Sequence, residues 1–126
     1  MICRIEAIDH VHLPLQDGAD LQALRTFYGE ILGLEEVTDD LPAGVVLAFR
    51  SRMLQLRLCS GRAGRIRRMY RGCVLVVESL EQMSQALHDA DIEHRWEHGW
   101  GYYGRRIFLR DPAGNLIELK EAPQPL

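Results

Sequence analysis

Residues 105–121 read RRIFLRDPAGNLIELKE. On each side of the DPAGN segment, apolar residues recur at every second position, as expected of half-buried β-strands. Asp, Pro, Gly and Asn are the residues that tight turns favour. The stretch therefore predicts a hairpin, with strands at 105–110 and 116–121. Because side chains alternate between the two faces of a strand, one face would bury the apolar set Ile107, Leu109, Ile117 and Leu119.

The segment before this hairpin predicts a strand, a helix and another strand. Residues 73–78 (CVLVVE) are mostly apolar and predict a strand. Ser79 and Gln82 then form a capping-box signature, which marks the start of a helix. EHRWE at 93–97 predicts the next strand. Together with the hairpin, these elements form one module over residues 70–121.

The first half of the chain has the same order. Alternation in IDHVHLPL, residues 8–15, predicts a strand. Apolar residues then recur at steps of three and four between residues 21 and 32, which predicts a helix that Gly33 ends. Two short strands follow at 44–50 and 53–59. These elements form a module over residues 5–59.

The two halves are related by a constant spacing. His10 precedes Leu21 by eleven residues, and Gly72 precedes Met83 by the same number. An offset of about 62 residues therefore indicates an internal repeat. We expect a single α+β domain over residues 1–126, in which each half has one helix covering one face of a small sheet. The other face needs a second cover, such as the other half, a partner chain or a ligand.

The composition disfavours several classes of protein. Fifteen basic and 18 acidic residues give a net charge of −3, whereas nucleic-acid-binding proteins usually carry a basic excess. No apolar run is long enough for a membrane helix, and residues 1–10 lack the apolar core of a secretory signal. The three cysteines have no paired spacing, so we expect free thiols in a reducing cytoplasm.

Three segments resemble the vicinal oxygen chelate superfamily, which includes glyoxalase I, fosfomycin and bleomycin resistance proteins, methylmalonyl-CoA epimerase and extradiol dioxygenases. They are IDHVHLPL (8–15), FYGEILGL (27–34) and RIFLRDPAGNLIELKE (106–121). The resemblance implies two βαβββ repeats that form a cup-shaped mixed sheet, and commonly a homodimer. In the enzymes it also implies one divalent metal ion inside the cup.

The resemblance places the metal ligands at four positions. Two of them keep a ligand residue, His10 on the first strand and Glu118 on the last. The other two depart from the enzymes. Gln55 offers only a neutral amide oxygen, and Gly72 stands where a histidine would open the second module. The resemblance therefore implies a divalent ion, such as nickel, iron, manganese or zinc, that His10 and Glu118 would have to hold without the other two usual ligands.

Strand alternation gives an independent expectation for the concave face. Polar residues share a face wherever the apolar residues share the opposite one. Phe108 is expected near Glu118, and Arg106 near Lys120, across the hairpin. The concave face would then carry His10, His12, Gln55, Arg57, Arg106, Phe108, Glu118 and Lys120. A polar interior of this kind suits a ligand better than a structural core.

Several of these residues have two interpretations. His12 could join His10 and Glu118 in a set of two imidazoles and one carboxylate, or could line the face without metal. Glu118 could be a metal ligand and the catalytic base, or could pair with Arg106 or Arg57. The latter two, with Phe108, Trp100 and Tyr103, are the candidate substrate-binding residues. The Trp96–Tyr103 segment could form a rim over the cup or a dimer interface. The basic run from Arg62 to Arg71 could contact a phosphate-bearing ligand or be solvated.

Two functions follow from these alternatives. The first is a metal-dependent lyase, isomerase or dioxygenase acting on a small oxygen-rich or carbonyl-containing metabolite. In such an enzyme a metal held by His10 and Glu118 would stabilise charge on the substrate oxygens. The second is a metal-free small-molecule-binding protein of the bleomycin-resistance kind. Both would be cytoplasmic homodimers without nucleic-acid or membrane partners.

Overall fold

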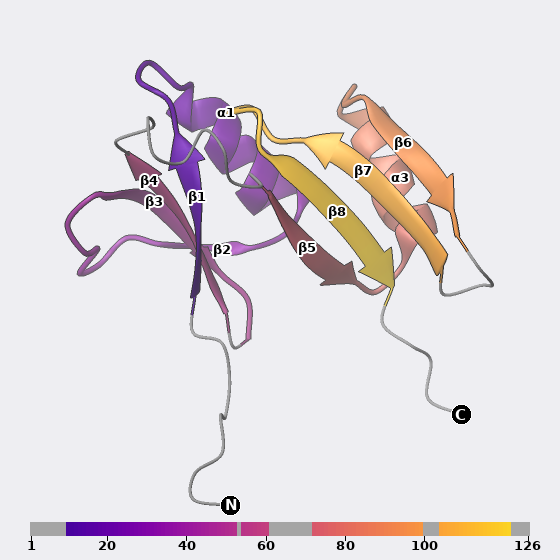
Figure 1. Ribbon diagram of the computed structural model, residues 1–126, viewed down its shortest axis with the longest axis horizontal. Helices are drawn as coiled ribbons and strands as arrows, with labels where there is room; N and C mark the ends of the chain where they lie inside the picture. The colour runs from indigo at the N-terminus through magenta and orange to yellow at the C-terminus, as the bar shows by residue number, and fades with distance from the viewer. Residues whose placement is uncertain (1–9, 53, 61–71, 100–103, 122–126) are drawn as a thin grey trace, which may run out of the picture.

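The strands form two four-stranded sheets with the same internal order (Figure 1). The computed structural model describes residues 10–52, 54–60, 72–99 and 104–121. The first module contains β1 (His10–Leu15), α1 (Leu21–Arg25), η1 (Thr26–Ile31), β2 (Glu35–Val37), β3 (Val45–Arg50) and β4 (Gln55–Ser60). The second contains β5 (Gly72–Val77), α3 (Leu80–Asp89), β6 (His94–His98), β7 (Arg105–Arg110) and β8 (Leu116–Glu121).

Each sheet combines one parallel pair with antiparallel pairs. The strand orders are β1-β4-β3-β2 and β5-β8-β7-β6. The first strand of each module runs parallel to the last, and the remaining neighbours are antiparallel. The α+β class and the repeated module that the sequence predicts are therefore confirmed. Strand β2 was not predicted, since its three residues EEV are too few to display an alternation.

The helix of the first module begins and ends where the sequence indicates, but its interior differs. Asp20 caps the start, because its Oδ1 accepts a hydrogen bond of 3.0 Å from the amide of Ala23. The α-helical turn of α1 then widens into the π-helical η1. Within η1 the consecutive residues Phe27 and Tyr28 are both buried, and the ring of Tyr28 lies 5.4 Å from that of Phe49. Gly33 follows the helix with a φ of +76°.

The helix of the second module matches its prediction closely. Ser79 Oγ accepts a hydrogen bond of 3.2 Å from the amide of Gln82, as the capping signature indicates. Leu80 and Leu87 are fully buried, and α3 covers one face of the second sheet (Figure 1). Hairpin residues Ile107, Leu109, Ile117 and Leu119 lie in the same core, which confirms the predicted apolar face.

The DPAGN turn joins the two modules. Asp111 Oδ1 accepts hydrogen bonds from the amides of Ala113 and Asn115, at 2.9 and 2.8 Å. Its Oδ2 accepts from Tyr28 Oη at 2.6 Å and from Asn115 Nδ2 at 2.9 Å. Asn115 Nδ2 also donates to the carbonyl oxygen of Pro14 in β1. Burial and the neighbouring carboxylate raise the pKa of Tyr28, so its hydroxyl remains a donor.

The helices of the described segments are all too short or too polar to cross a membrane. Cys59 and Cys73 are free thiols, in agreement with the cysteine spacing. Burial raises the pKa of both, that of Cys73 to about 11, so neither is a thiolate at neutral pH.

Candidate functional site

The first sheet presents a cluster of polar side chains on the face away from its helix, which we term the first polar face. It comprises His10, His12, Gln55 and Arg57. In the parallel β1–β4 pair, His10 lies opposite Gln55 and His12 opposite Arg57. Arg57 Nε donates a hydrogen bond of 3.0 Å to Gln55 Oε1. The predicted shared face of these four residues is therefore observed, with the Gln55 amide oxygen engaged by a cation.

The two imidazoles of this face stack on each other. The ring centroids of His10 and His12 are 4.6 Å apart, with planes inclined by 23°. A ring nitrogen binds metal through a lone pair in the ring plane, so stacked rings direct their lone pairs into separate planes. Burial, the imidazole of His10 and the guanidinium of Arg57 together lower the pKa of His12. His12 is therefore neutral at pH 7, which suits hydrogen bonding.

The corresponding surface of the second sheet, which we term the second polar face, carries Arg95, Glu97, Arg106, Phe108, Arg110, Leu116, Glu118 and Lys120, beside the exposed Val74 and Val76 of β5. Phe108 lies opposite Glu118 in the β7–β8 pair, as predicted. Arg106 Nε donates a hydrogen bond of 3.0 Å to Glu118 Oε1, with side chains 25% and 20% exposed. This ion pair is the one that the second interpretation of Glu118 predicts.

Gly72 occupies the position where the resemblance places a histidine ligand. It lies opposite Leu116 in the parallel β5–β8 pair. A Cβ atom built on Gly72 would overlap the carbonyl oxygen of Leu116, far inside van der Waals contact. Because that oxygen belongs to the backbone, a side chain at position 72 would require the two strands to separate. A histidine at position 72 is therefore excluded by packing, and the glycine that stands there offers no side-chain ligand atom.

These observations test whether the residues present suit a divalent metal. Within the described segments, no three His, Cys, Asp or Glu side chains gather closely enough to hold an ion. One chain thus does not bring His10, His12 and Glu118 together. Glu118 already neutralises Arg106, and Gln55 is bonded to Arg57. Within one chain, the described donors therefore do not form a metal site, and a metal ion on this protein remains a prediction.

The predicted aromatic rim over the cup is not observed at Trp96, the one of its Trp and Tyr residues that lies in the described part of the chain. Trp96 points toward α3, where its Nε1 donates a hydrogen bond of 3.3 Å to Ser84 Oγ, and it packs against the core. It therefore does not lie over the second polar face. Trp100 and Tyr103, together with the Arg62–Arg71 run, are outside the described residues.

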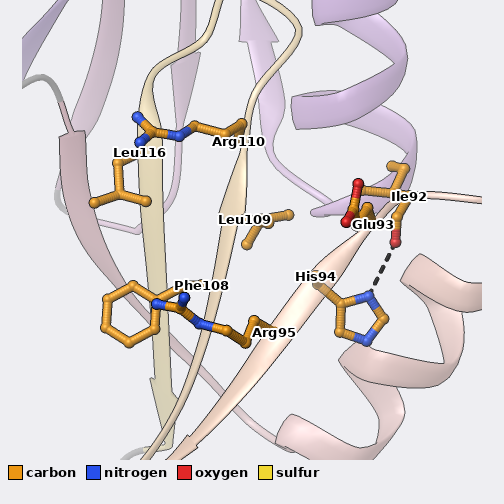
Figure 2. Close-up of a pocket in the computed structure, with 8 residues that line it drawn as sticks. All are labelled: Ile92, Glu93, His94, Arg95, Phe108, Leu109, Arg110 and Leu116. Atoms are coloured by element: carbon orange, nitrogen blue, oxygen red, sulfur yellow. Dashed lines mark hydrogen bonds between the residues drawn. The ribbon is translucent and has the colours of Figure 1, made fainter.

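A cavity of about 450 Å³ opens beside the second polar face, at the start of β6 (Figure 2). Among the described residues, Phe108 is the predicted ligand-binding residue that lines it. Arg95 and Arg110 were not predicted, although alternation in EHRWE and RRIFLR places both on the face of Phe108. The lining consists of Ile92, Glu93, His94, Arg95, Phe108, Leu109, Arg110 and Leu116.

Comparisons with known proteins agree on one fold. The model of the Glyoxalase/Bleomycin resistance protein/Dioxygenase superfamily matches residues 7–119. A solved structure from Bacillus anthracis, described as a glyoxalase family protein, is 25% identical, with a TM-score of 0.79 over 98% of this chain and 100% of that one.

Two other solved structures share the fold at lower identity. Lactoylglutathione lyase from Agrobacterium tumefaciens is 22% identical, with a TM-score of 0.69 over 94% of this chain and 95% of its own. An antibiotic-binding protein from a Streptomyces species is 18% identical, with a TM-score of 0.73 over 96% and 99%. No curated protein matches the sequence. The chain belongs to the Glyoxalase/Bleomycin resistance protein/Dioxygenase superfamily.

Proposed function

We propose that this member of the superfamily is a metal-free protein that binds an anionic or oxygen-rich small molecule on its polar faces. The observation that carries the proposal is the ion pair between Arg106 and Glu118, 3.0 Å long. A carboxylate already paired with a guanidinium gives up that partner before it can bind a metal ion. The packing of Gly72 against Leu116 supports the same conclusion.

The first polar face supplies the cation for such a ligand. Arg57 is half-buried, and within the described residues it has no carboxylate partner, only the amide oxygen of Gln55. A guanidinium offers five donors in a planar fork, which suits a carboxylate or phosphate group. The neutral ring of His12, opposite Arg57 in the register, adds a further polar group. Lys120 contributes positive charge on the second sheet, where Arg106 is paired with Glu118.

A second candidate is the metal-dependent lyase, isomerase or dioxygenase, with Glu118 as the base. The shared face of His10 and His12 favours it, because both imidazoles lie on one side of β1. The fold shared with lactoylglutathione lyase also favours it, as the fold shared with an antibiotic-binding protein favours the first. Both candidates include a homodimer in the cytoplasm as part of the proposal.

A thermal-shift screen distinguishes the two candidates. Small carboxylates, phosphates and polyphenols are tested with and without a chelator, since a ligand that binds only the folded state raises its stability. We expect at least one ligand to stabilise the protein by an amount that the chelator does not change. The apparent affinity for that ligand should be about tenfold weaker in Arg57→Gln. The matched control is Arg50→Gln, which removes an exposed arginine paired with Glu35. Stabilisation that disappears with chelator would favour the enzyme.

A further inference from the structure

The cavity beside the second polar face combines two apolar surfaces with two cations. Arg95 lies opposite Phe108 in the β6–β7 register, and its Cζ atom is 5.9 Å from the centroid of the Phe108 ring. Arg110 lies opposite Leu116 in the β7–β8 register. Figure 2 shows both guanidinium groups on the same side of the strands, one across Phe108 and the other toward Leu116. A flat surface is thus bounded by positive charge.

The charges of this wall favour an anion. In the described part of the lining, Glu93 is the one carboxylate, against Arg95 and Arg110. Arg95 also pairs with Glu97, but its side chain remains 73% exposed and accessible from solvent. Arg110 donates to the carbonyl oxygen of Gly114, and within the described residues it has no carboxylate partner. Its fork therefore retains donors for a ligand.

The size and chemistry of the wall indicate the class of ligand. A volume of about 450 Å³ lies within the range of sites for small organic molecules. The ring of Phe108 offers a face for stacking, and Arg95 over it adds cation–π attraction for a second ring. An aliphatic ligand would fill the cavity but could not stack on Phe108. A small inorganic anion would contact the arginines but leave the apolar surface uncovered.

We propose that this cavity binds a planar aromatic oxyanion, with its ring against Phe108 and Leu116 and its carboxylate or phosphate group held by Arg110 and Arg95. The inference rests on the proposed metal-free binding function and names the ligand class for its second sheet. Both arginine side chains are exposed, so replacing them leaves the core intact. The proposal can therefore be tested without unfolding the protein.

The test is calorimetric titration of the full chain with benzoate, naphthalene-2-carboxylate and phenyl phosphate. Each is compared with its neutral carboxamide or alcohol. We expect at least one anion to bind about tenfold or more tightly than its neutral counterpart. Arg110→Gln and Arg95→Gln should each reduce that difference, because both guanidinium groups hold the anionic group. Phe108→Leu should weaken the binding of the anion and of its neutral counterpart alike, because it removes the stacking surface. The control Arg50→Gln should leave the affinities unchanged.

Three outcomes would overturn the inference. The first is no binding by any of the three anions, and the second is equal binding of anions and neutral counterparts. The third is binding that is lost in Arg57→Gln or Arg106→Gln but kept in the cavity variants. In that third case the proposed function stands and only the location fails. The proposed function itself fails separately, when the broader ligand screen gives no chelator-independent stabilisation.

Discussion

At the scale of single residues, Gly72 has the largest consequence for function. The position faces a backbone carbonyl oxygen of the parallel partner strand, so hydrogen is the one side chain that fits. From the sequence alone, this is a position where the resemblance places a histidine and this chain has a glycine. The structure explains this glycine, since a Cβ atom at position 72 would overlap the carbonyl oxygen of Leu116 in β8.

Gly72→Ala should destabilise the protein by about 2 kcal/mol or more, because the added methyl group forces the strands apart. Urea unfolding followed by circular dichroism measures the effect. Gly29→Ala is the matched control, since a Cβ there meets its nearest neighbours at 3.9 and 4.0 Å. Equal stability of Gly72→Ala and the native chain would contradict the packing described for β5 and β8.

The pKa of His12 provides a second residue-scale prediction. Burial, His10 and Arg57 lower it below 6.5, so the folded state binds fewer protons than the unfolded state just below that pH. Any contribution of His12 to stability is therefore present above pH 6.5 and is lost as the pH falls below it. NMR titration of the ring protons should give a pKa below 6.5 that rises part of the way back in Arg57→Gln.

Arg110→Gln is the control for that titration, because it removes a guanidinium from the other sheet. It should leave the pKa of His12 unchanged. A native pKa at or above 6.5, or one insensitive to Arg57, would mean that the first polar face is not assembled as described.

At the scale of elements, the hairpin shows how much local sequence can predict. Alternation in RRIFLR and LIELKE gave the strands, the buried set and the pairing of Phe108 with Glu118, all of which are observed. Local patterns could not reveal the widening of the first helix at Thr26, because the helical spacing of apolar residues hardly changes there. Nor could they reveal that the DPAGN turn contacts Tyr28, 83 positions away.

Asp111→Asn should destabilise the protein by about 1–3 kcal/mol, because an NH2 group in place of the Oδ2 atom would face the Nδ2 donor of Asn115, which would then lack an acceptor there. Chemical denaturation measures the loss. Asp89→Asn is the matched control, since Asp89 accepts its hydrogen bond from Gln85 on the exposed surface of α3 and should lose little. Equal effects of the two variants would indicate that the turn does not join the modules.

At the scale of the whole molecule, the sequence predicted the family better than the site. The repeat and its motifs identified the two modules, which depend on patterns distributed over the whole chain. The site depends on which neighbour each polar group selects. From the sequence, Glu118 could bind a metal ion or pair with Arg57 or Arg106. The register of β7 and β8, in which Phe108 lies opposite Glu118, places Arg106 close enough to form the ion pair. Arg95 and Arg110 were missed because charged residues on exposed strand positions are usually solvated.

The most direct test of metal-free binding is the metal content of the protein. Native protein and Glu118→Gln are expressed in metal-replete medium, purified without chelator, and analysed by elemental mass spectrometry before and after titration with nickel, iron, manganese and zinc. We predict that both proteins carry far less than one ion per chain and do not differ. Stoichiometric metal in the native protein that is lost in Glu118→Gln would contradict the account.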